Sequence, residues 1–202
     1  DVEMDVSFDA TEFAGRKIVV FEELYQNGQL ISEHTDLKDE KQQLTIKNPK
    51  LHTTATDQAS GTHEAVAKKN VTINDEVRYE DIIPGTYLLK GIVMDKKTKK
   101  PLRINGKRVI SEKEIEIKED GTVKMEFTFD ATKLNNRSMV IFEYLYAKSP
   151  DGEDDELIAS HEDINDEGQT VRLKVGGLKA NLPGNKDSGV SGNMKSGVKT
   201  GD

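Results

Sequence analysis

The sequence predicts an all-β protein made of immunoglobulin-like antiparallel β-sandwich repeats. Three observations support this fold class: short segments in which polar and apolar residues alternate, turn residues between those segments, and no sustained helical period. Seven or so such segments with frequent turns are typical of an immunoglobulin-type sandwich. Charged residues make up 33% of the chain, and the apolar residues suffice for a modest core.

The strand signals follow one another from Leu51 onward. Glycine-containing pairs separate several of them, as at Pro84-Gly85 and Asn105-Gly106. The segment MVIFEYLY is apolar on both faces, as a central strand would be. We therefore expect a first strand at Leu51 and further strands over residues 71–79, 86–95, 108–117, 122–129, 139–146 and 169–175.

Part of the sequence is repeated. FDAT at Phe8 recurs at Phe129, and FE-x-LY at Phe21 recurs at Phe142, with one constant offset. A period this long indicates tandem domains rather than a solenoid of small units. The predicted organisation is the C-terminal half of a preceding repeat (1–48), a complete repeat (49–177) and a flexible tail rich in Gly, Ser, Asn and Lys (178–202). We also expect the chain to be a fragment of a longer polypeptide.

Several polar side chains share a strand face with core residues, where burial without a partner would be costly. Gln169, for example, has the same parity as Val171, Leu173 and Val175. The residues between them, Thr170, Arg172 and Lys174, form the polar face. Taken alone, a buried amide usually satisfies a backbone group. The complete repeat, however, directs four such groups inward: Thr53, Asp75, Glu143 and Gln169.

A histidine precedes the glutamine at the same spacing in both copies. His161 and Gln169 lie in the stretch from Leu157 to Val175, and His34 and Gln42 occupy the matching positions upstream. Two buried carboxyls share a proton, so a protonated Asp75 or Glu143 could polarise the glutamine carbonyl. The histidine could accept the proton of the threonine hydroxyl, as in a nucleophile–base pair. Attack on the glutamine side chain would then expel ammonia and leave an intramolecular ester.

These residues lie in motifs that resemble a known family. The set TTATD, VTINDEVRY, IPGTYLLKGIVMDKKTKKPL, MEFTFDAT, VIFEYLY and HEDINDEGQT is similar to the Thr-Gln ester-bonded repeat, also called the VaFE repeat, of Gram-positive surface-anchored proteins. The resemblance covers residues 48–175 as one repeat and 1–47 as the end of another. It implies that Thr53 and Gln169 are bonded and that His161, Asp75 and Glu143 assist. Thr54, beside Thr53, is the alternative nucleophile.

The upstream copy is incomplete. It keeps Gln42, His34 and Glu22, whereas the threonine and aspartate partners would precede Asp1, so we expect no bond within it. The tail is similar to the spacer and sorting signal of the family, although Val198 stands where the usual motif has proline, and LPGNK at Leu182 lacks the threonine and glycine. Cell-wall attachment is the expectation from this resemblance.

Composition excludes other classes of function. The net charge of −8 argues against a nucleic-acid partner, and the absence of cysteine removes disulfides and thiolate zinc sites. DINDEG at Asp163 offers oxygens as a calcium loop does, but Lys174 stands where an EF-hand needs glutamate. We therefore expect neither a metal nor a cofactor, and no turnover enzyme. A hydrolase using His161 is the weaker alternative.

The resemblance implies a structural role. We expect a stalk segment of an extracellular, cell wall-anchored adhesin, cross-linked by its own Thr-Gln ester for mechanical and proteolytic resistance. Its expected partners are neighbouring repeats of the same polypeptide, peptidoglycan through a downstream anchor, and a host ligand through a distal domain. The alternative function is a β-sandwich module that itself binds a host protein or glycan. An isopeptide bond is disfavoured because no lysine has a clearly apolar parity.

Overall fold

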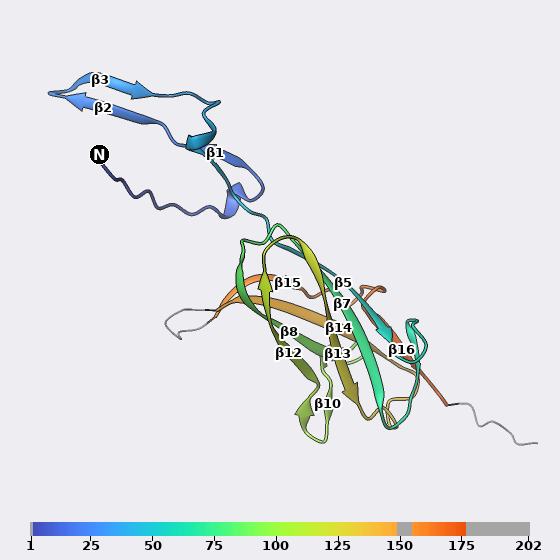
Figure 1. Cartoon of the computed structure of the whole chain (residues 1–202). Coiled ribbons are helices and arrows are strands. Elements are labelled where there is room, and N and C mark those ends of the chain that lie inside the picture. The colour runs from blue at the N-terminus through green and yellow to red at the C-terminus, as the bar shows by residue number, and fades with distance from the viewer. Residues whose placement is uncertain (1, 149–154, 177–202) are drawn as a thin grey trace, which may run out of the picture.

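The structure, a computed structural model, describes residues 2–148 and 155–176. A β-sandwich begins at Lys50, and the preceding segment extends from one end of it (Figure 1). The predicted all-β sandwich is confirmed. Within the described residues, no helix is both long and apolar enough to cross a membrane. The tail predicted for residues 178–202 lies outside the described part of the chain.

The N-terminal segment forms two small two-stranded sheets, β1 with β4 and β2 with β3. The β2–β3 hairpin turns at Asn27 and Gly28, which both have positive φ. Most side chains of this segment are exposed, including the apolar Leu24 and Ile31. Its elements are η1 (Thr11–Phe13), β1 (Lys17–Val19), β2 (Glu22–Gln26), β3 (Gln29–His34), η2 (Glu40–Gln42) and β4 (Gln43–Thr45).

The larger sheet of the sandwich is organised around β14, which pairs with β8 along one edge. Its other edge is shared: the first half of β14 pairs with β16, and the second half pairs with β15. All these pairings are antiparallel, and only the β16–β6 pair of this sheet is parallel. The strands are β6 (Glu64–Val66), β8 (Gly85–Asp95), β9 (Lys100–Pro101), β12 (Ile110–Ile117), β14 (Arg137–Ala147), β15 (Glu156–His161) and β16 (Thr170–Lys174).

The smaller sheet has the strand order β13–β7–β5 and is antiparallel throughout. It consists of β5 (Lys50–Asp57), β7 (Val71–Glu80) and β13 (Gly121–Phe129). A separate hairpin, β10 (Arg103–Ile104) with β11 (Lys107–Arg108), turns at the predicted Asn105-Gly106 pair, where both residues have positive φ. The sequence patterns missed β6 and β9 to β11, because two or three residues are too few to reveal an alternation. They also missed β15, whose residues ELIASH do not alternate between polar and apolar.

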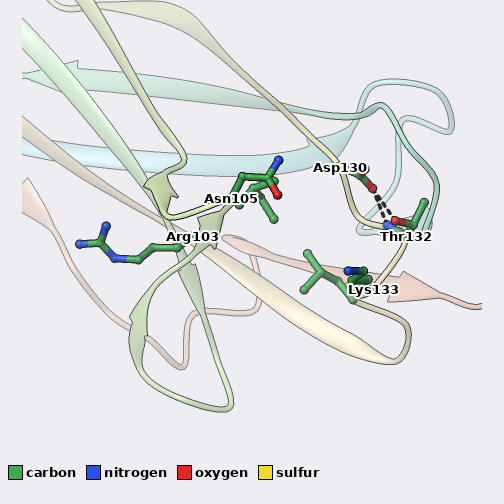
Figure 2. Close-up of a pocket in the computed structure, with 7 residues that line it drawn as sticks. Arg103, Asn105, Asp130, Thr132 and Lys133 are labelled. Atoms are coloured by element: carbon green, nitrogen blue, oxygen red, sulfur yellow. Dashed lines mark hydrogen bonds between the residues drawn. The ribbon is translucent and has the colours of Figure 1, made fainter.

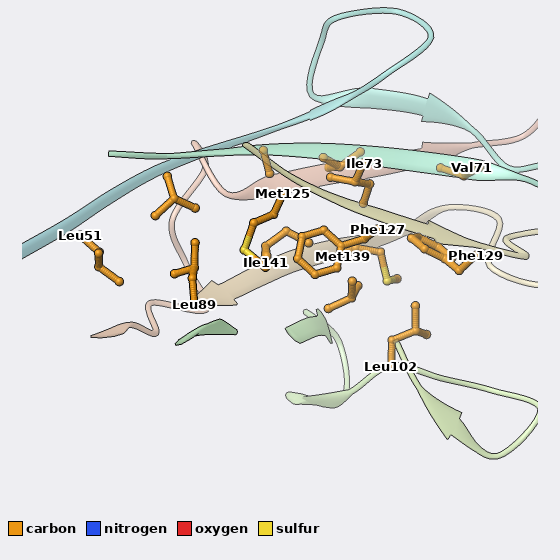
Figure 3. Close-up of a cluster of buried hydrophobic side chains, with 14 of the residues drawn as sticks. Leu51, Val71, Ile73, Leu89, Leu102, Met125, Phe127, Phe129, Met139 and Ile141 are labelled. Carbon is orange, nitrogen blue, oxygen red and sulfur yellow. The ribbon is translucent and has the colours of Figure 1, made fainter. Parts of the chain in front are cut away.

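The core lies between the two sheets (Figure 3). Ile73 and Phe127 from the smaller sheet pack with Leu89 and Ile141 from the larger one, and all four are almost fully buried. Gly91 on β8 makes room for the Phe127 ring: a Cβ built at Gly91 would lie 2.4 Å from Phe127 Cζ. Gly91 is also the β8 partner of Glu143. The Phe127 ring therefore covers the larger sheet beside that carboxyl group.

Two expectations about β16 were wrong. Val175 is 57% exposed, because the strand ends at Lys174, before the fourth inward position. Thr170, expected on the polar outer face, is buried. The loop before β16 explains why Thr170 is buried. The Thr170 hydroxyl donates to the backbone oxygen of Asp166 in this loop (2.6 Å) and accepts from Lys96 Nζ (3.2 Å). The loop and the lysine thus cover the outer side of β16 at this point.

Candidate functional site

The smaller sheet contributes Thr53 and Asp75 to the space between the sheets. Thr53 on β5 pairs with Val77, and Ala55 pairs with Asp75. Because residues two apart in a strand share a face, Thr53, Ala55 and Asp75 all point inward. Asp75 is completely buried, and it lies in the middle of β7 rather than in a turn. The β5–β7 ladder therefore brings a hydroxyl and a carboxyl to the same inner surface.

The larger sheet contributes the other three residues. Glu143 on β14 lies directly opposite His161, the last residue of β15. The backbone of Gln169 continues the β14–β16 ladder, since its oxygen accepts a hydrogen bond from the Ile141 amide (3.3 Å). Ile141 and Glu143 are two apart on β14 and share its inner face, where both are buried. One edge of β14 thus holds both the histidine and the glutamine, next to a buried carboxyl on that strand.

The two sheets meet at the Thr53 hydroxyl. Its oxygen lies 2.6 Å from His161 Nδ1 and 3.2 Å from Glu143 Oε2. The backbone amide of Ala55 donates to the oxygen of Gly168 (2.9 Å), which ties β5 to the residue just before Gln169. Thr54, by contrast, is exposed. Of the two adjacent threonines, Thr53 therefore has the position and the contacts of a nucleophile.

The Gln169 side chain is 1% exposed, and neither its amide nitrogen nor its oxygen has a hydrogen-bond partner among the described residues. Such a group is unusual, because leaving a buried polar side chain unpaired costs about 1 to 3 kcal/mol. Both Asp75 oxygens and Glu143 Oε1 are also buried without a partner of standard geometry within the described ranges. In the described part of the chain, five buried polar atoms without a partner thus belong to three of the predicted site residues.

The buried carboxyls favour their protonated forms. Burial raises the pKa of Asp75 from its ordinary value near 3.8 to about 7, although a side-chain interaction with Glu143 acts in the opposite direction. Burial also raises the pKa of Glu143 well above its ordinary value near 4.5, and the negative charge of Asp75 raises it further. Near neutral pH the pair therefore retains a proton that it can donate.

The structure adds one residue that the strand patterns did not identify. Asp166 lies in the loop between β15 and β16, and its Oδ2 is 3.0 Å from His161 Nε2. Parity could not find it, because a loop residue belongs to no strand face. The internal repeat contains a usable signal: Asp39 and Asp166 occupy the same position between the histidine and the glutamine of their copies.

The N-terminal copy arranges its equivalents in the same way. Gln42 Nε2 donates to Glu22 Oε2, and His34 Nδ1 lies 3.9 Å from that same oxygen. His34 Nε2 is 3.0 Å from Asp39 Oδ2. Glu22 and His34 are about half exposed, unlike Glu143 and His161. The N-terminal copy therefore has the glutamine, histidine and acidic residues of the site, but its histidine and glutamate are accessible to solvent.

A surface pocket of about 310 Å³ is separate from these groups (Figure 2). It lies beside the β10–β11 hairpin and the turn after β13, and none of the five predicted site residues lines it. Asp130, one of its acidic groups, already accepts hydrogen bonds from the Thr132 amide (2.9 Å) and hydroxyl (2.6 Å). Over residues 2–148 and 155–176, no cluster of His, Asp or Glu side chains has the arrangement of a metal site.

Comparisons with known proteins show the family and the fold of the chain. The family described as T-Q ester bond containing domain matches residues 1–46 and 49–173. No curated protein matches the sequence significantly. Two crystal forms of a bacterial adhesin from Mobiluncus mulieris, containing intramolecular disulfide, isopeptide and ester bond cross-links, share the fold with TM-scores of 0.52 and 0.51 at 18% and 15% identity. Each covers 64% of this chain, which spans 58% of the adhesin structure.

Proposed function

This chain belongs to the family of T-Q ester bond containing domains, and from that premise we propose that Thr53 and Gln169 form an ester inside its complete repeat. We further propose that the cross-linked module is a load-bearing stalk segment of a bacterial surface adhesin. The single observation that carries the first proposal is the Thr53 hydroxyl, 2.6 Å from His161 Nδ1 and on the inner side of the same sandwich as the unpaired Gln169 amide.

The reaction begins with proton transfer from Thr53. The hydroxyl has one proton, and its shorter contact is with His161 Nδ1 rather than with Glu143 Oε2. Neutral His161 accepts this proton as the Thr53 oxygen attacks the side-chain carbonyl carbon of Gln169. The resulting tetrahedral centre carries the former carbonyl oxygen, the threonine oxygen and the amide nitrogen.

The carboxyl pair stabilises that centre. A proton shared by Asp75 and Glu143 can be donated to the oxygen on which negative charge develops, because burial raises the pKa of both acids. The imidazolium of His161 then gives its proton to the amide nitrogen. The carbon–nitrogen bond breaks, ammonia leaves, and the ester between Thr53 and Gln169 remains. His161 and the acids return to their starting protonation states, but the chain reacts only once.

Exclusion of water protects the product. Asp75, Glu143 and Gln169 are all at most 1% exposed, and the Phe127 ring covers β8 next to Glu143. An ester at this position is shielded from hydrolysis, which would otherwise reverse the cross-link.

The mechanical role follows from the positions of the two ends. β5 is the first strand of the sandwich and β16 the last described one, so a Thr53–Gln169 bond closes a loop of roughly 100 residues and contributes about 4 to 5 kcal/mol by the chain-entropy model. Under tension, the force passes through this bond and leaves the intervening strands unloaded. Reinforcement of this kind suits a chain that has no cysteine for disulfides.

The surface location is part of the same proposal. An adhesin of the same fold contains ester, isopeptide and disulfide cross-links, which supports an extracellular stalk for this chain as well. Neighbouring repeats are its proposed direct partners, because the N-terminal segment has the residues of a second site. A downstream anchor would attach the polypeptide to peptidoglycan, and a distal domain would contact the host; the stalk segment itself needs no cofactor and no nucleic acid.

Intact-protein mass spectrometry tests the cross-link. The purified chain should be lighter than its sequence by one ammonia molecule, and Thr53→Ala should have the full sequence mass after allowance for the substitution. Thr54→Ala, which changes the exposed neighbour, is the matched control and should still lose ammonia. An unmodified mass for the natural chain would refute the ester, as would the loss of ammonia from Thr53→Ala.

A further inference from the structure

The loop between β15 and β16 places a second acidic group on the histidine of the site. Asp166 Oδ2 lies 3.0 Å from His161 Nε2, on the opposite side of the imidazole from Thr53, which contacts Nδ1. Thr53, His161 and Asp166 are therefore connected in series, with the imidazole in the middle. This is the order of groups in a nucleophile–base–acid triad.

The loop holds Asp166 firmly. Its other carboxyl oxygen, Oδ1, accepts a hydrogen bond from the Gly168 amide (2.7 Å). Its backbone amide donates to the oxygen of Asp163 (3.1 Å), and its backbone oxygen accepts from the Thr170 hydroxyl (2.6 Å). Because both its backbone and its side chain are fixed, Asp166 presents Oδ2 to the imidazole at little entropic cost.

The contact selects the tautomer of His161. In a neutral imidazole one nitrogen carries the proton and the other has the lone pair. A carboxylate beside Nε2 favours the tautomer with the proton on Nε2, which leaves the lone pair of Nδ1 facing the Thr53 hydroxyl. The other tautomer would direct a proton at Thr53 and could not accept one. The negative charge of Asp166 also stabilises the imidazolium that forms during the attack.

The second carboxyl near His161 does not replace Asp166. Glu143 Oε2 is 3.7 Å from Nδ1, on the side where the proton of Thr53 arrives. Glu143 is completely buried, so desolvation favours its neutral form, whereas the Asp166 side chain is 29% exposed and keeps contact with water. The two acids therefore differ in the nitrogen they face and in how far they are buried.

The N-terminal copy provides independent support. His34 Nε2 is again 3.0 Å from an aspartate oxygen, that of Asp39, whose other oxygen accepts from the Lys41 amide (2.9 Å). Four of the seven residues between its histidine and glutamine differ from those of the complete repeat, and its histidine is about half exposed. The histidine–aspartate contact is nevertheless retained, so it does not depend on burial of the histidine.

We propose that Asp166 is the positioning residue of the ester-forming reaction, which it serves by holding His161 in the tautomer that accepts the Thr53 proton. This inference rests on the proposed cross-link and adds a residue that the strand patterns did not identify.

The test follows the rate of ammonia loss in the full-length chain. Natural, Asp166→Asn and Asp163→Asn chains are purified unfolded from inclusion bodies, refolded by dilution, and sampled by intact mass spectrometry. Asp163→Asn is the matched control: Asp163 lies in the same loop and its carboxyl accepts from the Asn165 amide (2.9 Å), but it does not contact His161. We expect Asp166→Asn to slow the reaction about a hundredfold or more, since the equivalent change in serine proteases costs roughly 10⁴-fold.

The pH dependence separates positioning from general damage to the loop. The groups that face the imidazole are Thr53 from β5, Glu143 from β14 and Asp166 from the loop. Loss of the Asp166 charge makes the imidazolium less stable, so the acid limb of the rate profile should move to lower pH in Asp166→Asn. A mere packing defect would lower the rate without moving that limb. Asp163→Asn should keep the natural rate and profile.

A second measurement covers the case in which Asp166→Asn does not fold. Nitrogen NMR of the imidazole in Gln169→Leu, which cannot react but keeps Thr53 and Asp166, should show the proton of neutral His161 on Nε2. A proton on Nδ1 overturns the proposal, as does a natural rate in Asp166→Asn or an equal slowing in Asp163→Asn. Failure of the natural chain to lose ammonia refutes the cross-link itself, which is a separate result.

Discussion

Glu143 and His161 face each other across the β14–β15 ladder, and Glu143 Oε2 lies 3.7 Å from His161 Nδ1. The same Glu143 oxygen is 3.2 Å from the Thr53 hydroxyl. An ionised Glu143 would compete with the imidazole for the threonine proton, whereas a neutral Glu143 leaves that proton to His161. Burial favours the neutral form, since it raises the pKa of Glu143 well above the ordinary value. The desolvated position of Glu143 is thus compatible with an acid that donates rather than a base that accepts.

Gln169→Glu should abolish the cross-link. A carboxyl group at this position would have to expel water or hydroxide instead of ammonia, and a third carboxyl beside Asp75 and Glu143 would add repulsion in a buried site. We expect the intact chain to have the full mass of the substituted sequence, with neither water nor ammonia lost. Gln42→Glu, in the N-terminal copy, is the control and should react as the natural chain does. Loss of water from the Gln169→Glu chain would contradict the expectation.

Strand alternation was sufficient to place several site residues on inner faces. Asp75, Glu143 and Gln169 share a parity with core residues, and the structure buries all three. The same rule failed for Thr170, whose environment is set by a hydrogen bond to the Asp166 backbone and by Lys96 from another strand. Such tertiary contacts do not change the alternation of polar and apolar residues along a strand, so the alternation cannot predict them. The short strands β6 and β9 to β11 were missed for lack of length.

Strand parity could not identify Asp166 for a different reason. Its position depends on the path of the loop after His161, which the hydrogen bonds to Gly168 and Asp163 determine. Local composition suggested only a calcium-like turn at this place. The partner of His161 could be identified once the strands had brought Thr53 to one side of the imidazole and the loop to the other.

The stability of the unlinked sandwich should fall as the pH rises. Asp75 has a pKa of about 7 in the folded chain, above its ordinary value near 3.8, so between these values the folded state binds more protons than the unfolded state. The free energy of unfolding must then decrease with pH through this window. At 1.36 kcal/mol per unit, Asp75 accounts for a loss of at most about 4 kcal/mol.

Urea unfolding of Thr53→Ala at pH values on both sides of this window measures the effect. The midpoint should be higher in the acidic buffer. Adding Asp75→Asn to Thr53→Ala removes one of the two buried acids and should weaken the dependence, and the part that remains belongs to Glu143, whose pKa burial also raises. A midpoint that rises with pH in Thr53→Ala would show that the buried acid is not protonated in the folded state.

Gly91→Ala should destabilise the sandwich. The added Cβ would lie 2.4 Å from Cζ of Phe127, a ring that is 1% exposed and cannot move aside without disturbing the core. Overpacking of this kind typically costs about 1 to 3 kcal/mol. Chemical denaturation in the Thr53→Ala background avoids the contribution of the ester. Gly85→Ala is the control on the same strand, because its new Cβ would meet Tyr87 at an ordinary 3.4 Å. Equal losses at the two glycines would argue against the predicted clash.

Pulling the chain from its two ends should distinguish the linked from the unlinked sandwich. With the ester in place, the segment between Thr53 and Gln169 is bypassed by the force, so the natural chain should show no extension from unfolding of the strands between them. Thr53→Ala should release roughly 100 residues, an extension of roughly 350 Å at full stretch. Thr54→Ala changes an exposed hydroxyl on the same strand and should behave as the natural chain does. Single-molecule force spectroscopy resolves a step of this size, and finding it in the natural chain would show that Thr53–Gln169 does not carry the load.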